Sequence, residues 1–267
     1  MTDTQHKNHD AYYVPGLHRG LRVLELIGEA ERPLTISQVA ALLKISRSSA
    51  FRLLYTLRHM GFLKTGQDEK AFELGPRILN LGFAYLNRQD IVRLARPHLE
   101  RLRDETGVSS HLAIRDERDI LYLDCILSRT AFVTNISIGT RSPAHATALG
   151  WLLLGSLDDA GITELYAGKA MPARTAHTPI TPRALVDKVR AAAEAGYVVS
   201  RGFSQPGGSS VNAPVRDYTG SVVAAIDVSG PDIAFDFERL EQFYIPAVME
   251  TARAISSDIG HQASRPI

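Results

Sequence analysis

Residues 34–63, LTISQVAALLKISRSSAFRLLYTLRHMGFL, carry the strongest structural pattern in the first part of this chain. Apolar residues at helical spacing predict one short helix over residues 36–43 and a second over residues 47–60. Lys44, Ile45 and Ser46 separate the two helices, which is the length of a tight turn. Thr35 is a candidate N-cap for the first helix, and Gly61 ends the second. The stretch therefore predicts a helix-turn-helix.

The flanking segments predict the rest of a small domain over residues 14–75. An apolar helical pattern covers residues 17–30, between Pro15-Gly16 and Arg32-Pro33. Residues 62–65 and 71–74 are typical of two strands joined by a turn at residues 66–70, which predicts a wing. A further helical segment over residues 76–89 is expected to link this domain to the remainder of the chain.

Charge is segregated along the chain. The thirty-six residues from Arg32 to Gln67 include six Lys or Arg and no Asp or Glu. Residues 1–88 contain twelve Lys or Arg against eight Asp or Glu, net +4, whereas residues 89–267 contain 18 against 21, net −3. Because duplex DNA carries one negative charge per about 1.7 Å of its axis, an acid-free basic segment favours phosphate binding. The pattern indicates a DNA-binding head on a nearly neutral body.

The second helix of the helix-turn-helix presents a polar face opposite its apolar one. Ala50, Leu53, Leu54 and Leu57 share one side at 100° per residue, and hydroxyl, guanidinium and aromatic side chains cover the other. Such side chains contact base edges and phosphates when a helix lies in the major groove. We expect Arg47, Ser48, Ser49 and Arg52 to be the principal contacts. The full expected set is Arg47, Ser48, Ser49, Phe51, Arg52, Tyr55, Arg58, and Lys64 and Lys70 on the wing.

A simpler interpretation of this face stays open. Any surface helix has polar residues opposite its core, so a single Ser or Arg there is weak evidence. The array as a whole is stronger evidence, because a solvated face normally mixes both signs of charge. Phe51 and Tyr55 could instead pack against the neighbouring helix.

The second half of the chain predicts a second, larger domain over residues 90–262. Helices are expected over residues 91–106, with a kink or start near Pro97, and over residues 146–156, 162–166, 183–195 and 237–259. Strands are expected over residues 108–115, 120–127, 131–138, 196–199, 210–215 and 221–228. Antiparallel-type strands with helices grouped around them favour an α+β fold.

Composition excludes several classes of protein. The single cysteine, Cys125, cannot form an internal disulfide and fits a reducing compartment. No apolar run approaches the roughly 20 residues that cross a bilayer, and the N-terminal residues lack the apolar core of a signal peptide, so we expect a cytoplasmic protein. His111, His145 and Cys125 lack metal-ligand spacing, and no nucleophile or phosphate-loop motif occurs. We therefore expect no metal, no cofactor and no enzymatic activity.

Several motifs resemble a known family of bacterial transcription factors. LHRGLRVL (17–24), LTISQVA (34–40), SRSSAFRLL (46–54) and MGFL (60–63) are similar to the N-terminal domain of the IclR (isocitrate lyase regulator) family. GTRSPAHATALG (139–150), GYVV (196–199), APV (213–215) and AAIDVSG (224–230) resemble its effector domain. The resemblance covers about residues 16–260. It implies a winged helix-turn-helix, a linker helix and a GAF-like effector domain, assembled as a dimer or a dimer of dimers.

The resemblance also implies where a ligand binds. In the family, the helix after the His-Ala segment and the signature strands line the effector pocket. Here we expect Thr147, Ala148, Leu149, Ser200, Arg201, Ser210, Asp227 and Ser229, with Trp151 and Phe203 as apolar walls. Ser200-Arg201-Gly202-Phe203 stands where the family commonly has acidic residues, which favours an anionic ligand.

The expected function is that of a ligand-responsive regulator of a catabolic operon, which binds a palindromic operator in double-stranded DNA as a dimer. The effector is expected to be a small organic or aromatic acid. A hydroxylated acid would use both Asp227 and Arg201, with the carboxylate on Arg201 or on amides of the helix that begins near Ala146. The alternative is a small-molecule-binding or hydrolytic domain with a vestigial winged helix.

Overall fold

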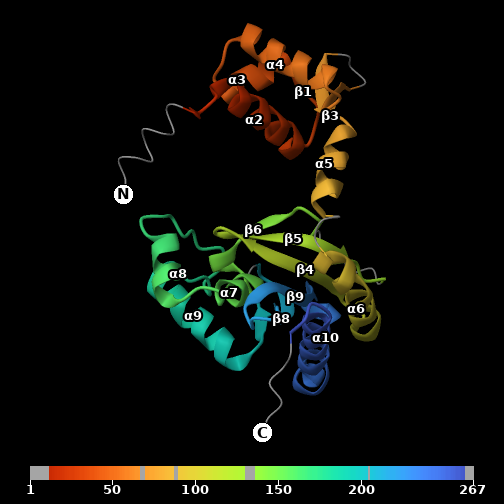
Figure 1. Cartoon of the computed structure of the whole chain (residues 1–267), viewed down its shortest axis with the longest axis vertical. Helices are drawn as coiled ribbons and strands as arrows, with labels where there is room; N and C mark the ends of the chain where they lie inside the picture. Colours follow the sequence, from red (N-terminus) through yellow and green to blue (C-terminus); the bar gives the residue numbers. More distant parts are fainter. Residues whose placement is uncertain (1–11, 67–69, 87–89, 130–135, 204, 262–267) are drawn as a thin grey trace. The chain divides into compact units, whose positions relative to one another are not determined.

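A computed structural model describes residues 12–66, 70–86, 90–129, 136–203 and 205–261 (Figure 1). The chain divides into two compact units, Met1–Leu86 and Asn87–Ile267. Each has its own core of buried apolar side chains. The fold is α+β, as expected from the order of the elements.

Three helices form the body of the first unit: α2 (Pro15–Glu29), α3 (Ile36–Leu43) and α4 (Arg47–His59). Thr35 and Gln38 form a capping box that begins α3, with the Thr35 amide 2.8 Å from Gln38 Oε1. Lys44 ends α3 with a φ of 53°, and its amide donates to the carbonyls of residues 40 and 41. The left-handed backbone conformation of Lys44 turns the chain between the two helices of the helix-turn-helix.

A small sheet completes the first unit. Its order is β1 (Leu34–Thr35), β3 (Ala71–Leu74) and β2 (Leu63–Thr65), and both pairings are antiparallel. β2 and β3 are the two expected strands of the wing, whose turn at residues 67–69 lies outside the described residues. β1 was not expected, because two residues are too short to show alternation. Helix α5 (Arg77–Leu86) follows within the predicted linker.

A six-stranded antiparallel sheet organises the second unit, in the order β6-β5-β4-β9-β8-β7. Its central strands are long and almost fully buried. The bounds are β4 (Ser109–Asp116), β5 (Asp119–Ile126), β6 (Arg141–Pro143), β7 (Val198–Arg201), β8 (Gly208–Arg216) and β9 (Val222–Pro231). The order brings β4 and β9, far apart in sequence, side by side at the centre.

Helices cover both faces of this sheet. Ser110 on β4 donates to the Leu99 carbonyl of α6 (Asp90–Thr106), whereas its neighbour His111 contacts Tyr122 on the opposite face. Helix α10 (Ile245–Asp258) packs with α6, joined by His98 and Asp258 at 2.8 Å. The other face packs against α7 (Ala148–Leu154), and α8 (Asp159–Tyr166) and α9 (Pro182–Ala195) lie beyond it.

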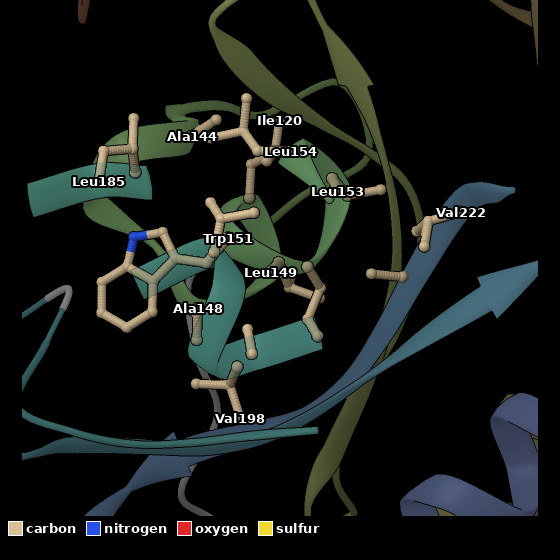
Figure 2. Packing of buried hydrophobic residues seen from close by; sticks show 14 of the residues in the cluster. Ile120, Ala144, Ala148, Leu149, Trp151, Leu153, Leu154, Leu185, Val198 and Val222 are labelled. Atoms are coloured by element: carbon tan, nitrogen blue, oxygen red, sulfur yellow. The ribbon is translucent and has the colours of Figure 1, made fainter. Parts of the chain in front are cut away.

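Helix α7 is the centre of the larger core (Figure 2). All seven of its residues are buried. Figure 2 shows the labelled α7 side chains, such as Leu149 and Trp151, among Leu185 of α9 and the strand residues Val198 and Val222. A Cβ on Gly150 would lie 2.1 Å from the Ala144 carbonyl oxygen, so glycine is required for this close approach. The packing fixes the start of α7 against the sheet, beside the polar cavity described below.

Helix boundaries differ from the expected ones for identifiable reasons. The helix expected over residues 146–156 is a 3-10 turn (Ala144–Ala146) followed by α7, because Thr147 is the N-cap and accepts from the Gly150 amide at 3.1 Å. The last expected helix starts only at Ile245, with Pro246 in its first turn, after the 3-10 segments Asp232–Ala234 and Phe237–Arg239 and the π-helix Leu240–Tyr244. Helix α6 begins at Asp90 and continues through Pro97.

Strand boundaries also differ. β7 starts two residues later than expected, because Gly196 ends α9 with a φ of 74°. Most of the strand expected over residues 131–138 lies outside the described residues, and the described residues 136–138 form no strand. β6 was missed because its three residues have no alternating pattern.

Within the described residues, no helix is long and apolar enough to cross a membrane.

Candidate functional site

Helix α4 presents the face that the sequence predicts to read DNA. Ser46 begins the helix, and its hydroxyl accepts from the Ser49 amide at 3.2 Å. Ala50 and Leu54 are buried in the small core with Val23 and Val39. Burial of this side fixes the rotation of α4, so the opposite side faces solvent. Six expected contacts on α4 are exposed there: Arg47, Ser48, Phe51, Arg52, Tyr55 and Arg58.

Ser49 differs from the other expected contacts on α4. Its side chain is half-buried, and its hydroxyl lies 2.9 Å from Ser46 Oγ. Ser48 Oγ also lies 3.0 Å from Ser46 Oγ. The three hydroxyls therefore form one cluster at the positive end of the helix dipole, where amide groups and hydroxyls favour an anion.

The wing supplies two exposed lysines. Lys64 on β2 forms an ion pair with Glu73 on β3, with 3.0 Å between Nζ and Oε1. Both side chains are solvent-exposed, so the pair is weak and leaves the lysine able to exchange Glu73 for a phosphate. Lys70 is exposed at the start of the second wing strand.

The second unit contains a polar cavity of about 220 Å³ beside the start of α7. Seven of the eight expected effector residues line it: Thr147, Ala148, Leu149, Ser200, Ser210, Asp227 and Ser229. The other lining residues are Tyr122, Ile136, Ser142, Arg174, Gln205, Gly208, Ser209, Asn212 and Gly230. Strands β7, β8 and β9 thus bring residues from 52 (Ser200) to 81 (Ser229) positions beyond Ala148 to the start of α7.

Arg201, the eighth expected residue, does not line this cavity. Side chains alternate along a strand, so the buried Ser200 and the exposed Arg201 lie on opposite faces of β7. The Arg201 guanidinium carbon lies 3.9 Å from the centre of the Phe237 ring. Trp151 and Phe203, the expected apolar walls, contact each other at 5.3 Å between ring centres and lie outside the lining set.

Arg174 is a basic residue in the cavity wall that no sequence motif identifies. It lies in the segment between α8 and α9. The Thr178 hydroxyl accepts from the amides of Arg174 and Thr175 at 3.1 Å each, and Thr175 Oγ1 donates to the Phe203 carbonyl. These bonds fix the backbone beside Arg174 relative to the loop after β7.

A buried histidine orients the acidic residue of the cavity. His111 Nδ1 lies 2.7 Å from Asp227 Oδ1 and 3.2 Å from Ser229 Oγ. The side chains of His111 and Asp227 are 0% and 4% exposed. The sequence identified Asp227 but not this pairing, because His111 lies 116 residues earlier.

Two further polar residues of the cavity wall, Tyr122 and Asn212, have defined roles in hydrogen bonding. Desolvation, and next the charge of Asp227, raise the pKa of Tyr122, so its hydroxyl stays protonated and can donate. Asn212 Nδ2 donates to Ser210 Oγ and to the Val198 carbonyl, each at 2.9 Å. The cavity thus combines one guanidinium, one carboxylate and several hydroxyls, which suits a small ligand that carries both an acid group and a hydroxyl. Among the described residues, no group of three His, Cys, Asp or Glu could bind a metal ion.

Comparison with known proteins identifies relatives of both units. Residues 16–66 match the family described as "IclR helix-turn-helix domain", and residues 83–257 match "Bacterial transcriptional regulator IclR C-terminal". The Pca regulon regulatory protein of Pseudomonas putida is 33% identical over 262 residues, covering 95% of this chain and 85% of that protein.

Two solved structures are similar to this chain over most of its length. A putative transcriptional regulator from Rhodococcus sp. RHA1 has 32% identity and a TM-score of 0.81, covering 92% of this chain and 98% of that one. An IclR homologue from Microbacterium hydrocarbonoxydans, in complex with 4-hydroxybenzoate, has 26% identity and a TM-score of 0.76, covering 91% and 98%.

Proposed function

This chain belongs to the IclR family of bacterial transcriptional regulators, and we propose that it controls a catabolic operon in response to a small hydroxylated aromatic acid. The family consists of DNA-binding regulators with a C-terminal effector domain of the GAF-like type, not of enzymes, which excludes the hydrolytic alternative. We place the protein in the cytoplasm, where it has access to the chromosome.

DNA binding is assigned to the exposed face of α4 and to the wing. Arg47, Arg52 and Arg58 provide three guanidinium groups on one helix, without an acid between Arg32 and Gln67 to repel phosphates. Ser48, Ser49, Phe51 and Tyr55 contribute the remaining contacts on α4, and Lys64 and Lys70 extend the charged surface to the wing. Phosphate contacts position the domain, and contacts to base edges select the operator.

We assign the homodimer interface to two helices with exposed apolar side chains. Leu17 and Leu21 on α2 are 62% and 53% exposed, and Leu79, Leu81 and Phe83 on α5 are 56–61% exposed. Within the described chain, α5 has no buried residue despite its apolar composition. Exposed apolar surface of this kind is typical of a protein interface. Two copies would place one α4 in each half-site of a palindromic operator.

The effector assignment rests on one observation: Arg174 and Asp227 line the same small cavity. A guanidinium forms strong charge-assisted hydrogen bonds with a carboxylate. Asp227 is engaged by His111 through Oδ1, so its other oxygen can accept a ligand hydroxyl. The volume lies below the usual range of ligand sites, which favours a small ligand with a single ring. A relative that binds 4-hydroxybenzoate supports this chemistry. Ser200, Ser210, Ser229 and Thr147 would surround the ring with hydroxyls.

Calorimetric titration with 4-hydroxybenzoate and benzoate tests the effector assignment. We expect Arg174→Ala to weaken both ligands by at least about tenfold, the range of a charged hydrogen bond. Asp227→Asn should reduce the preference for the hydroxylated ligand. Arg201→Ala is the matched control, since its guanidinium stacks on Phe237 and should leave both affinities within about twofold. Unchanged binding in Arg174→Ala would contradict the assignment.

A further inference from the structure

An exposed aromatic series runs along the solvent side of α4. Phe51, Tyr55 and His59 recur every four residues, so they lie one above the other on the helix. Ring centres are 6.1 Å apart between Phe51 and Tyr55, and 6.4 Å apart between Tyr55 and His59. Phe51 and Tyr55 are 50% and 57% exposed, and neither belongs to the core of the first unit. The core therefore does not explain why a phenylalanine stands at position 51.

Phe51 lies among the residues expected to contact DNA. It follows Arg47 by four positions and Ser48 by three, so the three side chains occupy one helix face. It is in the second turn of α4, and the N-terminal turns of a recognition helix are the ones that contact base edges. Arg52, the next residue, is exposed as well.

Charge favours DNA over a protein as the partner of this surface. The segment around Phe51 carries arginines and no acidic residue, which complements a polyanion. A phenyl ring, however, forms no hydrogen bond and no ion pair with phosphate. Its partner within the groove must be apolar, and the 5-methyl group of thymine is the apolar group that the major groove offers.

We propose that Phe51 reads the 5-methyl group of a thymine in each operator half-site, with Tyr55 packed beside Phe51 to restrict its ring. This inference rests on the proposed binding of DNA by α4. It adds that one base contacted in each half-site is a thymine. The contact distinguishes T·A from G·C and C·G, and it also distinguishes T·A from A·T because the methyl group lies on one side of the groove.

Replacement of thymine by uracil provides the test, because uracil lacks only the methyl group. The probe is a DNA duplex selected from a random-sequence library by the full-length protein, with each thymine of one half-site then replaced in turn by uracil. We expect one replacement to weaken binding by about fourfold, the transfer free energy of one buried methyl group. Phe51→Ala should bind the thymine duplex about sixteenfold more weakly, because the variant dimer loses the contact of about fourfold in both half-sites. The variant should also lose its sensitivity to the uracil replacement, because that replacement removes a contact already absent.

Two variants serve as controls. Leu42→Ala removes a side chain of similar exposure, 56%, from α3, which crosses the DNA backbone in a helix-turn-helix, and it should retain the response to uracil. Phe51→Leu retains an apolar contact and should keep part of that response. Thermal unfolding of each variant confirms folding, which an exposed position should tolerate.

The outcomes separate this inference from the proposed function. If no sequence is enriched from the library, the assignment of DNA binding itself fails. If a sequence is enriched but no uracil replacement changes affinity, or Phe51→Ala responds to uracil as the parent does, the thymine contact is wrong while DNA binding stands. Loss of dimerisation in Phe51→Ala, with an unchanged uracil response, would assign the aromatic series to a protein interface instead.

Discussion

His111 Nδ1 and Asp227 Oδ1 lie 2.7 Å apart across strands β4 and β9, with both side chains buried beside the polar cavity. The chain contains a second His–Asp pair of almost the same length, His98 Nε2 and Asp258 Oδ2 at 2.8 Å, but there Asp258 is 46% exposed. The two pairs have similar contact distances and differ in burial. Comparing the stability that is lost when each contact is removed therefore measures the effect of burial.

We expect Asp227→Ala to destabilise the second unit by about 3 kcal/mol, because it removes the 2.7 Å contact between two buried polar side chains. Asp258→Ala should cost less than about 1 kcal/mol, as is usual for an exposed pair. Urea unfolding of both variants measures the difference. Equal losses of stability in the two variants would contradict the structural role given to His111 and Asp227.

The thiol of Cys125 should be inert. Burial, and next the charges of Asp227 and Asp124, raise its pKa to about 12. Because its pKa is raised, Cys125 is a neutral thiol at pH 8. Alkylating reagents react with the thiolate and not with the thiol. We expect alkylation by iodoacetamide at pH 8 to be about a thousandfold slower in the folded protein than in urea, with the rate increasing as pH approaches 12. Labelling at the same rate in both states would show that Cys125 is not in this environment.

Gly150→Ala should deform the start of α7. The added Cβ would lie 2.1 Å from the Ala144 carbonyl oxygen, and overpacking of this kind costs about 1–3 kcal/mol or more. Gly20→Ala, in a helix with nothing within 4 Å of the new Cβ, is the control and should be neutral or slightly stabilising. Thermal unfolding compares the two. A Gly150→Ala protein as stable as the parent would refute the close approach of α7 to residue 144.

Trp151 should report ligand binding. It is the single tryptophan of the chain, it packs against Phe203, and its Nε1 donates to the His145 carbonyl at 2.8 Å. Ala148 and Leu149 on the same helix line the cavity. We expect 4-hydroxybenzoate to change the tryptophan emission in the parent protein with a saturating dependence, and Arg174→Ala to shift the midpoint to higher concentration. A response in Arg174→Ala with the parent's midpoint would argue against ligand contact with that arginine.

Local patterns in the sequence predicted most of the elements, and the family resemblance predicted seven of the residues that line the cavity. Periodic segments such as α3, α4 and α9 were identifiable because their apolar residues recur at helical spacing. Ser200 and Arg201 show the limit. They are adjacent in sequence, and only the register of β7 with β8 determines that Ser200 faces the cavity while Arg201 does not.

Residues on irregular segments were harder to predict. Arg174 lies between two helices in a segment with no periodic pattern, and its position depends on hydrogen bonds with Thr178. The pairing of β4 with β9 places His111 opposite Asp227, and no local sequence pattern relates these two positions. Tertiary pairing, not local propensity, thus determined which polar residues meet.

We propose that the acid-free face of α4 binds the operator, and the variant Arg52→Ala tests this assignment. Affinity for an operator duplex and for random DNA should be measured over a range of salt concentrations. Arg22→Ala is the matched control, because Arg22 is exposed on α2 and pairs with Glu25 within the same unit. We predict that Arg52→Ala weakens operator binding by at least about tenfold and reduces the preference over random DNA, with a shallower salt dependence. Arg22→Ala should stay within about twofold of the parent. Unchanged operator affinity and sequence preference in Arg52→Ala would contradict the assignment of operator binding to this face of α4.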